Sequence, residues 1–429
     1  MRSPDRVVIL NDASVVRGGA TYLATTLARS LHARGLAVTF LAGDSGNRDL
    51  GEGIDMLALE GRALIHAPRA SALKGLYNAA ARHRISEWIA RHDTPGTVYH
   101  LHNWSNILTP AVFDALAPVA RRCAIHVHDF FLACPNGAFL DYPRARVCNR
   151  RPLSAACLTT QCDKRSYSHK LWRSARQAVL WNRLAPFRSG AQFVMINEAM
   201  RSRIGRAIRP GHLAAISNPV EPFGAPVPAP ERNRRLVQIG QVQRLKGVFE
   251  LAEAGRRLGL GVDFIGMGDS LDELRTLYPE HAYHGWMSRE EIGRFLNGAR
   301  AAVVATQSPE PFCLSAFECV ATGLPLVVSD SILTARQLVE AGAAVTFCAG
   351  DVEALTAALG RVLRDDDLVA RLAAAARERG PGLAPGLAEW VAAHDRLYRR
   401  MLARSLEPVS LRRQAAEDMP ATPVEEALE

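Results

Sequence analysis

The sequence predicts an α/β protein built from two doubly wound, Rossmann-like domains that face each other across a cleft. The chain has 429 residues, which is longer than the ~250–300 residues at which a single hydrophobic core usually stops growing. In both halves, short apolar runs alternate with segments of helical period, a pattern typical of a parallel sheet covered on both faces. Between the halves, residues 219–230 (PVEPFGAPVPAP) are too rich in proline for either element and indicate a semi-rigid linker.

The first domain is expected over residues 1–218. Its first strand is Val7–Leu10, and a loop from Asn11 to Gly19 follows. The next segment, residues 20–33, repeats leucine at helical spacing and is followed by a glycine suited to end a helix. Further strands are expected at residues 37–42, 97–101 and 123–127. The last two end in polar loops, and such loops line the ligand crevice of an open α/β sheet.

The second domain is expected over residues 236–385, after a linker at 219–235. Its apolar runs, separated by helical patterns, lie at residues 236–240, 262–266, 301–305, from Pro325 onward, and 344–348. Asp351 is placed to cap one of the intervening helices, with Glu353 in its first turn. A C-terminal helix is expected over residues 386–405, and the polar tail 406–429 is expected to be disordered.

Composition excludes several classes of protein. The chain is 48% hydrophobic and 22% charged, as in ordinary globular proteins. It contains no apolar run of about 18 residues, so a membrane-spanning helix is not expected. The N-terminal sequence lacks the features of a signal peptide, and a cytoplasmic location is therefore expected. An NAD enzyme fits poorly, because the loop containing Gly18 and Gly19 does not continue as G-x-G-x-x-G.

The most informative motif is a pair of glutamates, Glu310 and Glu318, with seven residues between them. A predicted strand ends at Ala305, Glu310 follows in a loop, and a helix is expected to start near Leu314. Free N–H groups at such a helix N-terminus attract phosphate. Glu318, one turn into the helix, can accept hydrogen bonds from a ribose diol, and Glu310 can reach hydroxyls beyond the phosphates. The motif therefore predicts a sugar-nucleotide site.

Together with this motif, three other segments extend a resemblance over the chain up to about residue 405: RGGA (17–20), IGQVQRLKG (239–247) and the GLPLVVS run (323–329). The chain resembles the retaining glycosyltransferases of family 4, which have the GT-B fold. The resemblance implies a nucleotide-sugar donor whose diphosphate lies between Gly18-Gly19 and Lys246, and a reaction in which the leaving phosphate takes the acceptor proton. It implies no cofactor and no metal for catalysis. It assigns catalytic positions to His128, Glu310 and Lys246, and donor-binding positions to Gly18, Gly19, Gln241, Arg244, Lys246, Leu314, Ser315 and Glu318.

Gln241 departs from the family pattern, which usually has arginine at this position. Glutamine donates hydrogen bonds but carries no charge, so the diphosphate loses one cationic partner. Arg244 is a candidate replacement. The departure leaves two alternatives open besides a glycosyltransferase: a GT-B epimerase or phosphorylase acting on the same kind of donor, and a non-catalytic partner protein that has kept the fold.

Two H-x-H pairs occur, His100/His102 and His126/His128. Histidines at i and i+2 of a strand share a face and can bind metal, although unliganded core or cleft histidines are the favoured interpretation. The resemblance places only His128 at the sugar. His102, Asn103 and Asp129 are candidates for the acceptor side. The acceptor is expected to be a saccharide or a lipid-linked saccharide, as in synthesis of cell-surface polysaccharide or glycoconjugate.

A basic, cysteine-containing insert is expected at about residues 130–190, and between Arg144 and Arg209 there are 15 Lys or Arg but only two acids. Four cysteines, Cys134, Cys148, Cys157 and Cys162, are a candidate structural zinc set, with free thiols as the favoured alternative. Residues 166–188 are expected to form a basic amphipathic helix, with Leu171 on its apolar stripe and Lys170, Arg173, Arg176 and Arg183 outside that stripe. It either binds anionic lipid at the inner face of the membrane or, as favoured, packs on its own domain. Nucleic acid is not an expected partner.

Overall fold

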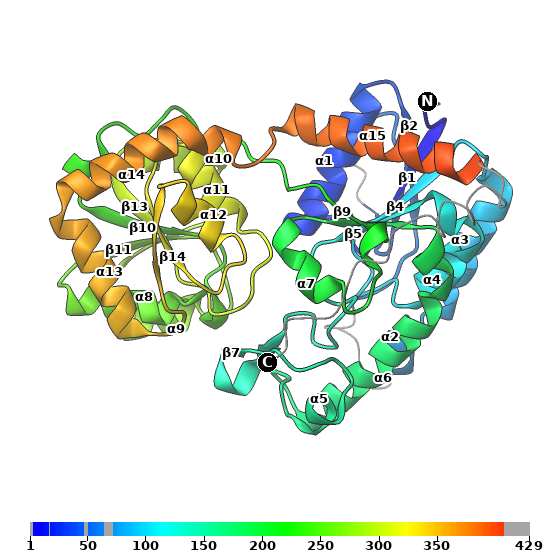
Figure 1. Ribbon diagram of the computed structural model, residues 1–429, viewed down its shortest axis with the longest axis horizontal. Coiled ribbons are helices and arrows are strands. Elements are labelled where there is room, and N and C mark those ends of the chain that lie inside the picture. The colour runs from blue at the N-terminus through cyan, green and yellow to red at the C-terminus, as the bar shows by residue number, and fades with distance from the viewer. Residues whose placement is uncertain (1–2, 17, 47–49, 64–71, 407–429) are drawn as a thin grey trace, which may run out of the picture.

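The computed structural model describes residues 3–16, 18–46, 50–63 and 72–406. Arg17 and the tail from residue 407 onward, about which the sequence makes predictions, lie outside these ranges. Two α/β domains stand side by side (Figure 1). The predicted pair of doubly wound domains is thereby confirmed, and this architecture places two sets of strand ends opposite each other.

The first domain contains a seven-stranded sheet in the order β3-β2-β1-β4-β5-β8-β9, in which each neighbouring pair is parallel. The strands are β1 (Arg6–Asn11), β2 (Ala37–Ala42), β3 (Asp55–Ala58), β4 (Thr97–Leu101), β5 (Cys123–Val127), β8 (Gln192–Met195) and β9 (Leu213–Ala215). A separate antiparallel pair joins β6 (Leu140–Asp141) to β7 (Arg146–Val147). The helices are α1 (Gly19–Ala33), α2 (Ala72–Leu76), α3 (Ala79–His92), α4 (Ala111–Leu116), α5 (Ala155–Thr159), α6 (Tyr167–Arg183) and α7 (Arg201–Ile204).

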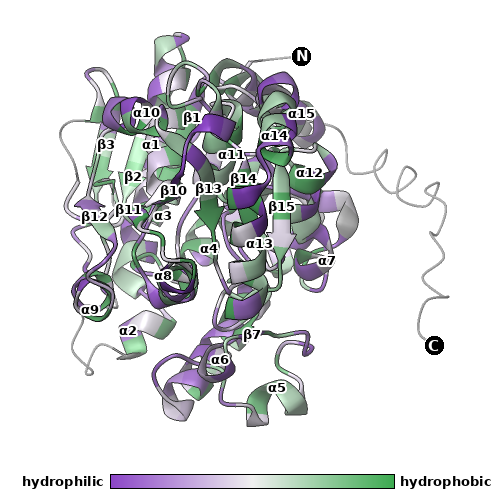
Figure 2. Cartoon of the chain, turned by 90° about the vertical axis from the view of Figure 1, so that its left-hand side faces the viewer, coloured by the Kyte–Doolittle hydropathy of each residue, from purple (hydrophilic) through white to green (hydrophobic). Residues whose placement is uncertain are grey.

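The second domain contains a six-stranded parallel sheet in the order β12-β11-β10-β13-β14-β15. Its strands are β10 (Arg235–Ile239), β11 (Val262–Ile265), β12 (Ala282–Gly285), β13 (Ala299–Val304), β14 (Leu326–Ser329) and β15 (Ala344–Phe347). Its helices are α8 (Val248–Arg257), α9 (Leu271–Leu277), α10 (Arg289–Leu296), α11 (Leu314–Ala321), α12 (Ala335–Glu340), α13 (Val352–Arg364) and α14 (Asp366–Arg379). The strands are apolar and the surrounding helices carry the polar surface (Figure 2).

Each sheet reverses its strand order at one point, between β1 and β4 in the first domain and between β10 and β13 in the second. Ligands of open α/β folds bind beyond the carboxyl ends of strands at such switch points. The loops after β1 and β4 contain Gly18 and His102, and the loops after β10 and β13 contain Lys246 and Glu310. The topology therefore brings segments far apart in the sequence to the facing edges of the two domains.

The last helix, α15 (Leu387–Leu406), returns from the second domain and lies across the first (Figure 1). Trp390, Tyr398 and Leu402 are almost completely buried and share a hydrophobic cluster with α1 and with strands of the first sheet. The segment expected as a linker is also packed. The Phe223 N–H donates to the Thr322 hydroxyl at 2.9 Å, and Val220 N–H donates to the Pro385 carbonyl at 2.9 Å.

Helix α6 does not present the surface that its sequence predicts. Lys170 and Arg176, expected on a solvated basic face, are buried, whereas Leu171 of the expected apolar stripe is exposed. Arg173 pairs with Asp163 at 3.1 Å, and Arg183 pairs with Asp114 at 3.3 Å. These internal contacts use basic groups of α6, and binding of the helix to anionic lipid stays an untested prediction.

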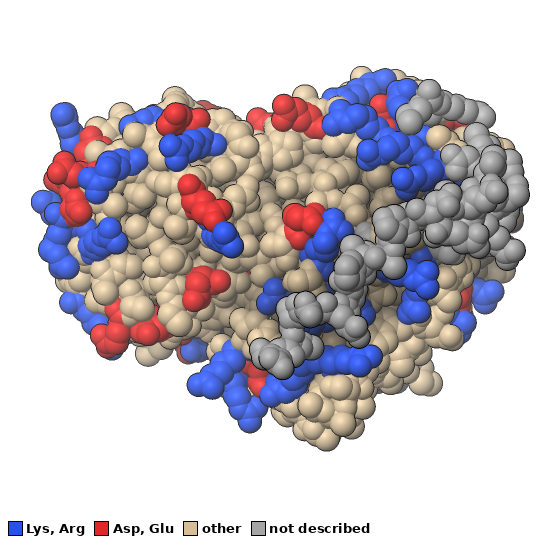
Figure 3. Space-filling model, in the orientation of Figure 1, with Lys and Arg blue, Asp and Glu red and all other residues tan. Residues whose placement is uncertain are grey.

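Other basic side chains of the insert do reach the surface, where Lys and Arg gather over β7 (Figure 3). Among the described residues, none of the helices combines the length and apolar character that crossing a bilayer requires.

Candidate functional site

A cavity of about 700 Å³ lies between the two domains. Both sheets contribute to its walls through the loops at their switch points. Nine of the residues to which the sequence assigns a site role line it: Gly18, Gly19, His128, Gln241, Lys246, Glu310, Leu314, Ser315 and Glu318. The structure therefore brings together most of the predicted residues, which come from segments as much as 300 positions apart.

Two helix N-termini open onto the cavity from opposite sides. Helix α1 begins after Gly18 and helix α11 begins after Cys313, and neither has a side-chain cap among the described residues. Uncapped N-termini present free backbone N–H groups and a partial positive charge, which favour a phosphate. The domains approach closely here, because a Cβ atom on Gly19 would lie 3.6 Å from Leu314 Cδ1. Glycine at positions 18 and 19 keeps this wall of the cavity free of side chains.

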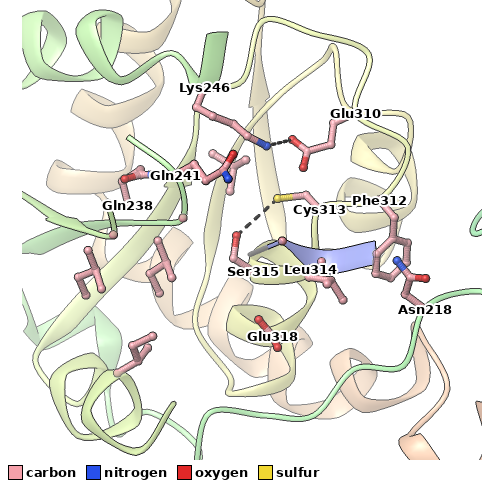
Figure 4. Close-up of a pocket in the computed structure, with 18 of the residues that line it drawn as sticks. Asn218, Gln238, Gln241, Lys246, Glu310, Phe312, Cys313, Leu314, Ser315 and Glu318 are labelled. Atoms are coloured by element: carbon pink, nitrogen blue, oxygen red, sulfur yellow. Dashed lines mark hydrogen bonds and ion pairs between the residues drawn. The ribbon is translucent and has the colours of Figure 1, made fainter. Parts of the chain in front are cut away.

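Lys246 supplies a cation on the second-domain side. Its Nζ atom lies 2.7 Å from Glu310 Oε2 (Figure 4). Burial lowers the pKa of Lys246, but the Glu310 carboxylate raises it, and the net shift is upward. The ammonium group therefore stays charged at neutral pH. The following turn depends on Gly247, whose φ is +70° and whose Cβ, if present, would lie 1.9 Å from the Ala305 carbonyl oxygen.

Glu318 lies one turn into α11, at the floor of the cavity (Figure 4). Its carboxylate pairs with the guanidinium of Arg289 at the start of α10. Burial raises the pKa of Glu318, and Arg289 opposes this shift. Arg289 also donates to the Glu221 carbonyl at 2.7 Å and lines the cavity. It has no signal in the sequence, because its partner is 29 residues away on another helix.

Other lining residues also escape prediction, among them Asn218, Gln238, Trp286 and Met267. The Oδ1 atom of Asn218 and the Oε1 atom of Gln238 are buried and have no hydrogen-bond partner among the described residues. Buried acceptors of this kind are costly unless a donor reaches them, so they are available to ligand hydroxyl or N–H groups. Trp286 and Met267, which are 76% and 55% exposed, form an apolar part of the wall. An exposed tryptophan ring offers a stacking surface to a planar group.

Arg244 does not line the cavity, contrary to its predicted role. Its guanidinium pairs with Glu273 at 2.6 Å and lies 4.0 Å from the centre of the Phe249 ring. Both contacts hold the side chain on the outer surface of the second domain. Gln241, by contrast, does line the cavity. The uncharged Gln241 therefore faces the site, whereas Arg244, the candidate replacement for the missing cation, faces away from it.

Of the polar residues to which the sequence assigns a site role in the first domain, only His128 lines the cavity. Burial and the nearby His394 lower the pKa of His128 to about 3, so the imidazole is neutral at pH 7. His102, expected on the acceptor side, is 1% exposed, and its Nδ1 lies 3.0 Å from His128 Nε2. His102 therefore contacts the His128 ring on the side away from the cavity and helps to hold that ring in position.

The two remaining acceptor-side candidates, Asn103 and Asp129, are not among the lining residues. Asn103 N–H donates to the Asn11 side chain at 2.9 Å, and Asp129 accepts the Phe131 N–H at 2.9 Å. Burial raises the pKa of Asp129 to about 6. Both residues shape the loops around the site.

The four cysteines of the insert lie near one another but do not form a four-ligand centre. Among the described residues, no three of their Sγ atoms lie within 4.8 Å of one another. The buried Lys170 Nζ donates to Cys157 Sγ at 3.2 Å, and Asn136 bridges the other two buried thiols, Cys134 (3.1 Å) and Cys162 (3.6 Å). The fourth, Cys148, contacts Arg150 at 3.6 Å. A structural zinc ion bound by these residues stays an untested prediction.

The fold is GT-B: two parallel-sheet domains meet at a cleft lined by the switch-point loops of both. Similarity to solved structures agrees. Sucrose-phosphate synthase from Thermosynechococcus elongatus superposes with a TM-score of 0.70 at 16% identity, covering 93% of this chain and 100% of that one. WaaG, a glycosyltransferase involved in lipopolysaccharide biosynthesis, superposes with a TM-score of 0.64 at 14% sequence identity, and the match covers 91% of this chain and 99% of WaaG. Anabaena HepE in complex with UDP-glucose superposes with a TM-score of 0.62 at 14% sequence identity, and the match covers 93% of this chain and 99% of HepE.

Sequence comparison gives the family. The model described as Glycosyltransferase Family 4 matches residues 17–222, and that described as Glycosyl transferases group 1 matches residues 222–379. The chain belongs to the family 4-type glycosyltransferases. Among curated proteins, glycogen synthase of Mycobacterium tuberculosis is 26% identical over 278 residues, which cover 60% of this chain. The match spans 64% of the length of that relative.

Proposed function

We propose that this protein is a retaining glycosyltransferase that uses a nucleotide-sugar donor. The observation that carries the proposal is the cavity between the domains, where two uncapped helix N-termini and the Lys246 ammonium converge. This arrangement suits a diphosphate, which needs several N–H donors and at least one cation. Structures of a fold neighbour, Anabaena HepE, hold UDP and UDP-glucose, which supports a donor of the same chemical class.

Each part of such a donor has a partner of matching chemistry. The diphosphate lies between the Gly18-Gly19 wall and Lys246. Glu318, which Arg289 holds in place, accepts hydrogen bonds from the ribose hydroxyls. Trp286 offers its exposed ring to the base. Glu310 and the neutral His128 bind hydroxyls of the sugar.

The chemistry follows from the charges in the cavity. Among the described lining residues, Glu310 and Glu318 are the only carboxylates, and each is paired with a cation. Neither is a free nucleophile for a covalent sugar intermediate, and this favours attack by the acceptor on the face from which the diphosphate departs. The bond from the anomeric carbon to phosphate oxygen breaks, the bond to the acceptor oxygen forms, and the acceptor proton passes to the leaving phosphate. Lys246 and the helix N-termini stabilise the negative charge that develops on that group.

The acceptor is proposed to be a saccharide or a lipid-linked saccharide, with a role in polysaccharide or glycoconjugate synthesis in the cytoplasm. Support comes from two similar proteins, a glycogen synthase and a glycosyltransferase involved in lipopolysaccharide biosynthesis. The acceptor would enter beside His128, the first-domain residue that faces the sugar.

The proposal is tested first by thermal unfolding with UDP, GDP, ADP, CMP and dTDP, using wild type, Glu318→Ala and Glu273→Ala. Glu273 is a matched control, because it is a glutamate on the outer surface of the same domain. A ligand at 100 times its dissociation constant stabilises the fold by about 2.7 kcal/mol. We expect one nucleotide to stabilise wild type and the Glu273 variant but not the Glu318 variant.

The nucleotide sugar that contains this nucleotide is then incubated with the protein and saccharide acceptors. The anomeric configuration of the product is determined by NMR. A product with the configuration of the donor supports the retaining mechanism, and an inverted product excludes it. Release of free sugar or an epimer without acceptor would favour the epimerase alternative. If no nucleotide stabilises the wild-type protein, the chain has the fold without donor binding, and the proposal fails.

A further inference from the structure

Behind His128, away from the cavity, lies a cluster of histidines that the proposed transfer reaction does not use. His100 and His102 come from β4 and its end, and His126 comes from β5. The two strands are parallel neighbours, so the histidine pairs lie side by side. The cluster is completed by His394 of α15, the helix that returns from the second domain.

Three of these residues converge on one point. His100, His126 and His394 each offer a ring nitrogen, and the three nitrogens lie within 4.8 Å of one another. All three residues are buried, with exposed fractions of 0–2%. The ring centres of His100 and His126 are 5.2 Å apart, and that of His394 lies 5.4 and 5.5 Å from them. Three imidazoles from two strands and a helix form a preassembled, nitrogen-rich set.

The outer contacts of the cluster orient these nitrogens inward. His394 Nδ1 lies 2.9 Å from the Trp390 carbonyl oxygen. A carbonyl only accepts, so Nδ1 carries the proton and Nε2 of the neutral ring is a bare lone pair. That Nε2 is buried and has no hydrogen-bond partner in the described part of the chain. On the opposite side, His100 Nδ1 lies 2.7 Å from the Tyr398 hydroxyl. Its Nε2 is hydrogen-bonded to His126 Nδ1 at 3.1 Å, and an ion bound at this point would replace that hydrogen bond.

Metal-binding histidines show the same arrangement, in which one ring nitrogen binds the ion and the other is held by a carbonyl or hydroxyl group. The third member, His126, also has a buried Nε2 without a partner among the described residues. Buried ring nitrogens without a partner are destabilising unless a cation or another hydrogen-bonding group fills the space. Since the ligand atoms are nitrogens, the site suits zinc and related transition metals rather than magnesium or calcium.

We propose that His100, His126 and His394 bind one divalent transition-metal ion, with zinc as the first candidate. The ion joins α15 to the first sheet, and so ties the C-terminal helix to the wall of the donor cavity. His126 stacks on His128 with ring centres 4.2 Å apart, and the bound ion fixes the position of that stack. Its role is to position His128, and no step of the transfer reaction passes through it.

The test measures metal in the purified full-length chain after removal of loosely bound ions and addition of Zn²⁺ or Co²⁺. We expect about one ion per chain. The cobalt form is expected to show ligand-field absorption without the thiolate-to-cobalt charge-transfer band that cysteine ligands produce. His394→Ala is expected to lose the ion. Two matched variants are expected to keep it: His281→Ala, which changes a buried histidine of the second domain, and Cys157→Ser, which changes the thiol cluster.

Tyr398→Phe keeps the aromatic ring and removes only the hydroxyl that holds His100. We expect this variant to remain folded by circular dichroism and to bind the metal 10–100-fold more weakly. The proposal is overturned if wild type binds no metal under these conditions, in which case buried water fills the space. It is also overturned if the ion is lost in Cys157→Ser but kept in His394→Ala, since the cysteines would then be the ligands.

Discussion

The Nζ atom of Lys246 lies 2.7 Å from the Oε2 atom of Glu310, and this contact joins the two loops that leave the switch point of the second sheet. The lysine follows β10 and the glutamate follows β13. Glu310 holds the ammonium at the cavity wall and raises its pKa. A diphosphate that binds there meets a cation whose position is already fixed, which lowers the entropy cost of binding.

Replacing Lys246 with alanine removes that cation and leaves Glu310 unpaired. We expect the Kd for the preferred nucleoside diphosphate to rise at least about 10-fold, equivalent to about 1.4 kcal/mol, in isothermal titration calorimetry. Lys74→Ala, on the exposed surface of α2, is the control and should leave the Kd unchanged. Equal affinities in wild type and Lys246→Ala would remove Lys246 from the donor site.

Glu318→Gln tests the proposed contact with the ribose, because glutamine has nearly the same side-chain shape as glutamate but carries no charge. Because burial raises the pKa of Glu318, loss of the charge should not destabilise the fold, whereas nucleotide binding should weaken about 10-fold as charge-assisted hydrogen bonds are lost. The pH dependence follows from the same shift. As pH falls through the raised pKa, the wild-type carboxylate becomes protonated and affinity drops, while this step should be missing in the glutamine variant. A wild type and variant with the same pH profile would contradict this role.

Gln241→Arg restores the charge that family members usually carry. Gln241 is exposed and lines the cavity, so an arginine there should bind the diphosphate about 2- to 5-fold more tightly, in keeping with the roughly 0.5–1 kcal/mol of an exposed ion pair. The gain should vanish in 1 M salt, which screens charges beyond about 3 Å. An absence of any gain at low salt would show that the side chain does not reach the phosphates.

Gly247→Ala should destabilise the second domain by at least about 2 kcal/mol, measured by denaturant unfolding. The new Cβ would both occupy a left-handed conformation and collide with the Ala305 carbonyl oxygen. Gly259→Ala separates these causes, since Gly259 has a φ of +63° but no atom within 4 Å of its would-be Cβ. We expect the free energy of unfolding of the control variant, Gly259→Ala, to fall by only about 1 kcal/mol. Equal losses would show that the contact with Ala305 relaxes freely.

Local patterns predicted the elements well. The expected strands at residues 37–42, 97–101 and 123–127 match β2, β4 and β5 residue for residue, because buried parallel strands are short apolar runs with polar ends. The spacing of Glu310 and Glu318 was equally informative, since one loop and one helical turn fix both side chains to the same strand end.

Helix α6 shows where such patterns fail. Its sequence places apolar residues on one stripe and basic residues outside it, yet Lys170 and Arg176 are buried and Leu171 is exposed. Long basic side chains are buried when the tertiary structure supplies partners, here Cys157 for Lys170 and the Ser105 carbonyl for Arg176. Helical period alone cannot identify those partners.

By itself, the sequence determined the two α/β domains, many of their strands and helices, and the loops that contain Gly18, Lys246 and Glu310, because these depend on patterns within a few residues. Strands β3, β8, β9 and β12 have no counterpart among the expected strands. Only the tertiary structure decided that Arg289 pairs with Glu318, that Arg244 faces away from the cavity, and that His394 joins His100 and His126. These contacts join segments from 29 to about 300 residues apart. They form because the crossovers of each sheet and the return of α15 bring those segments together.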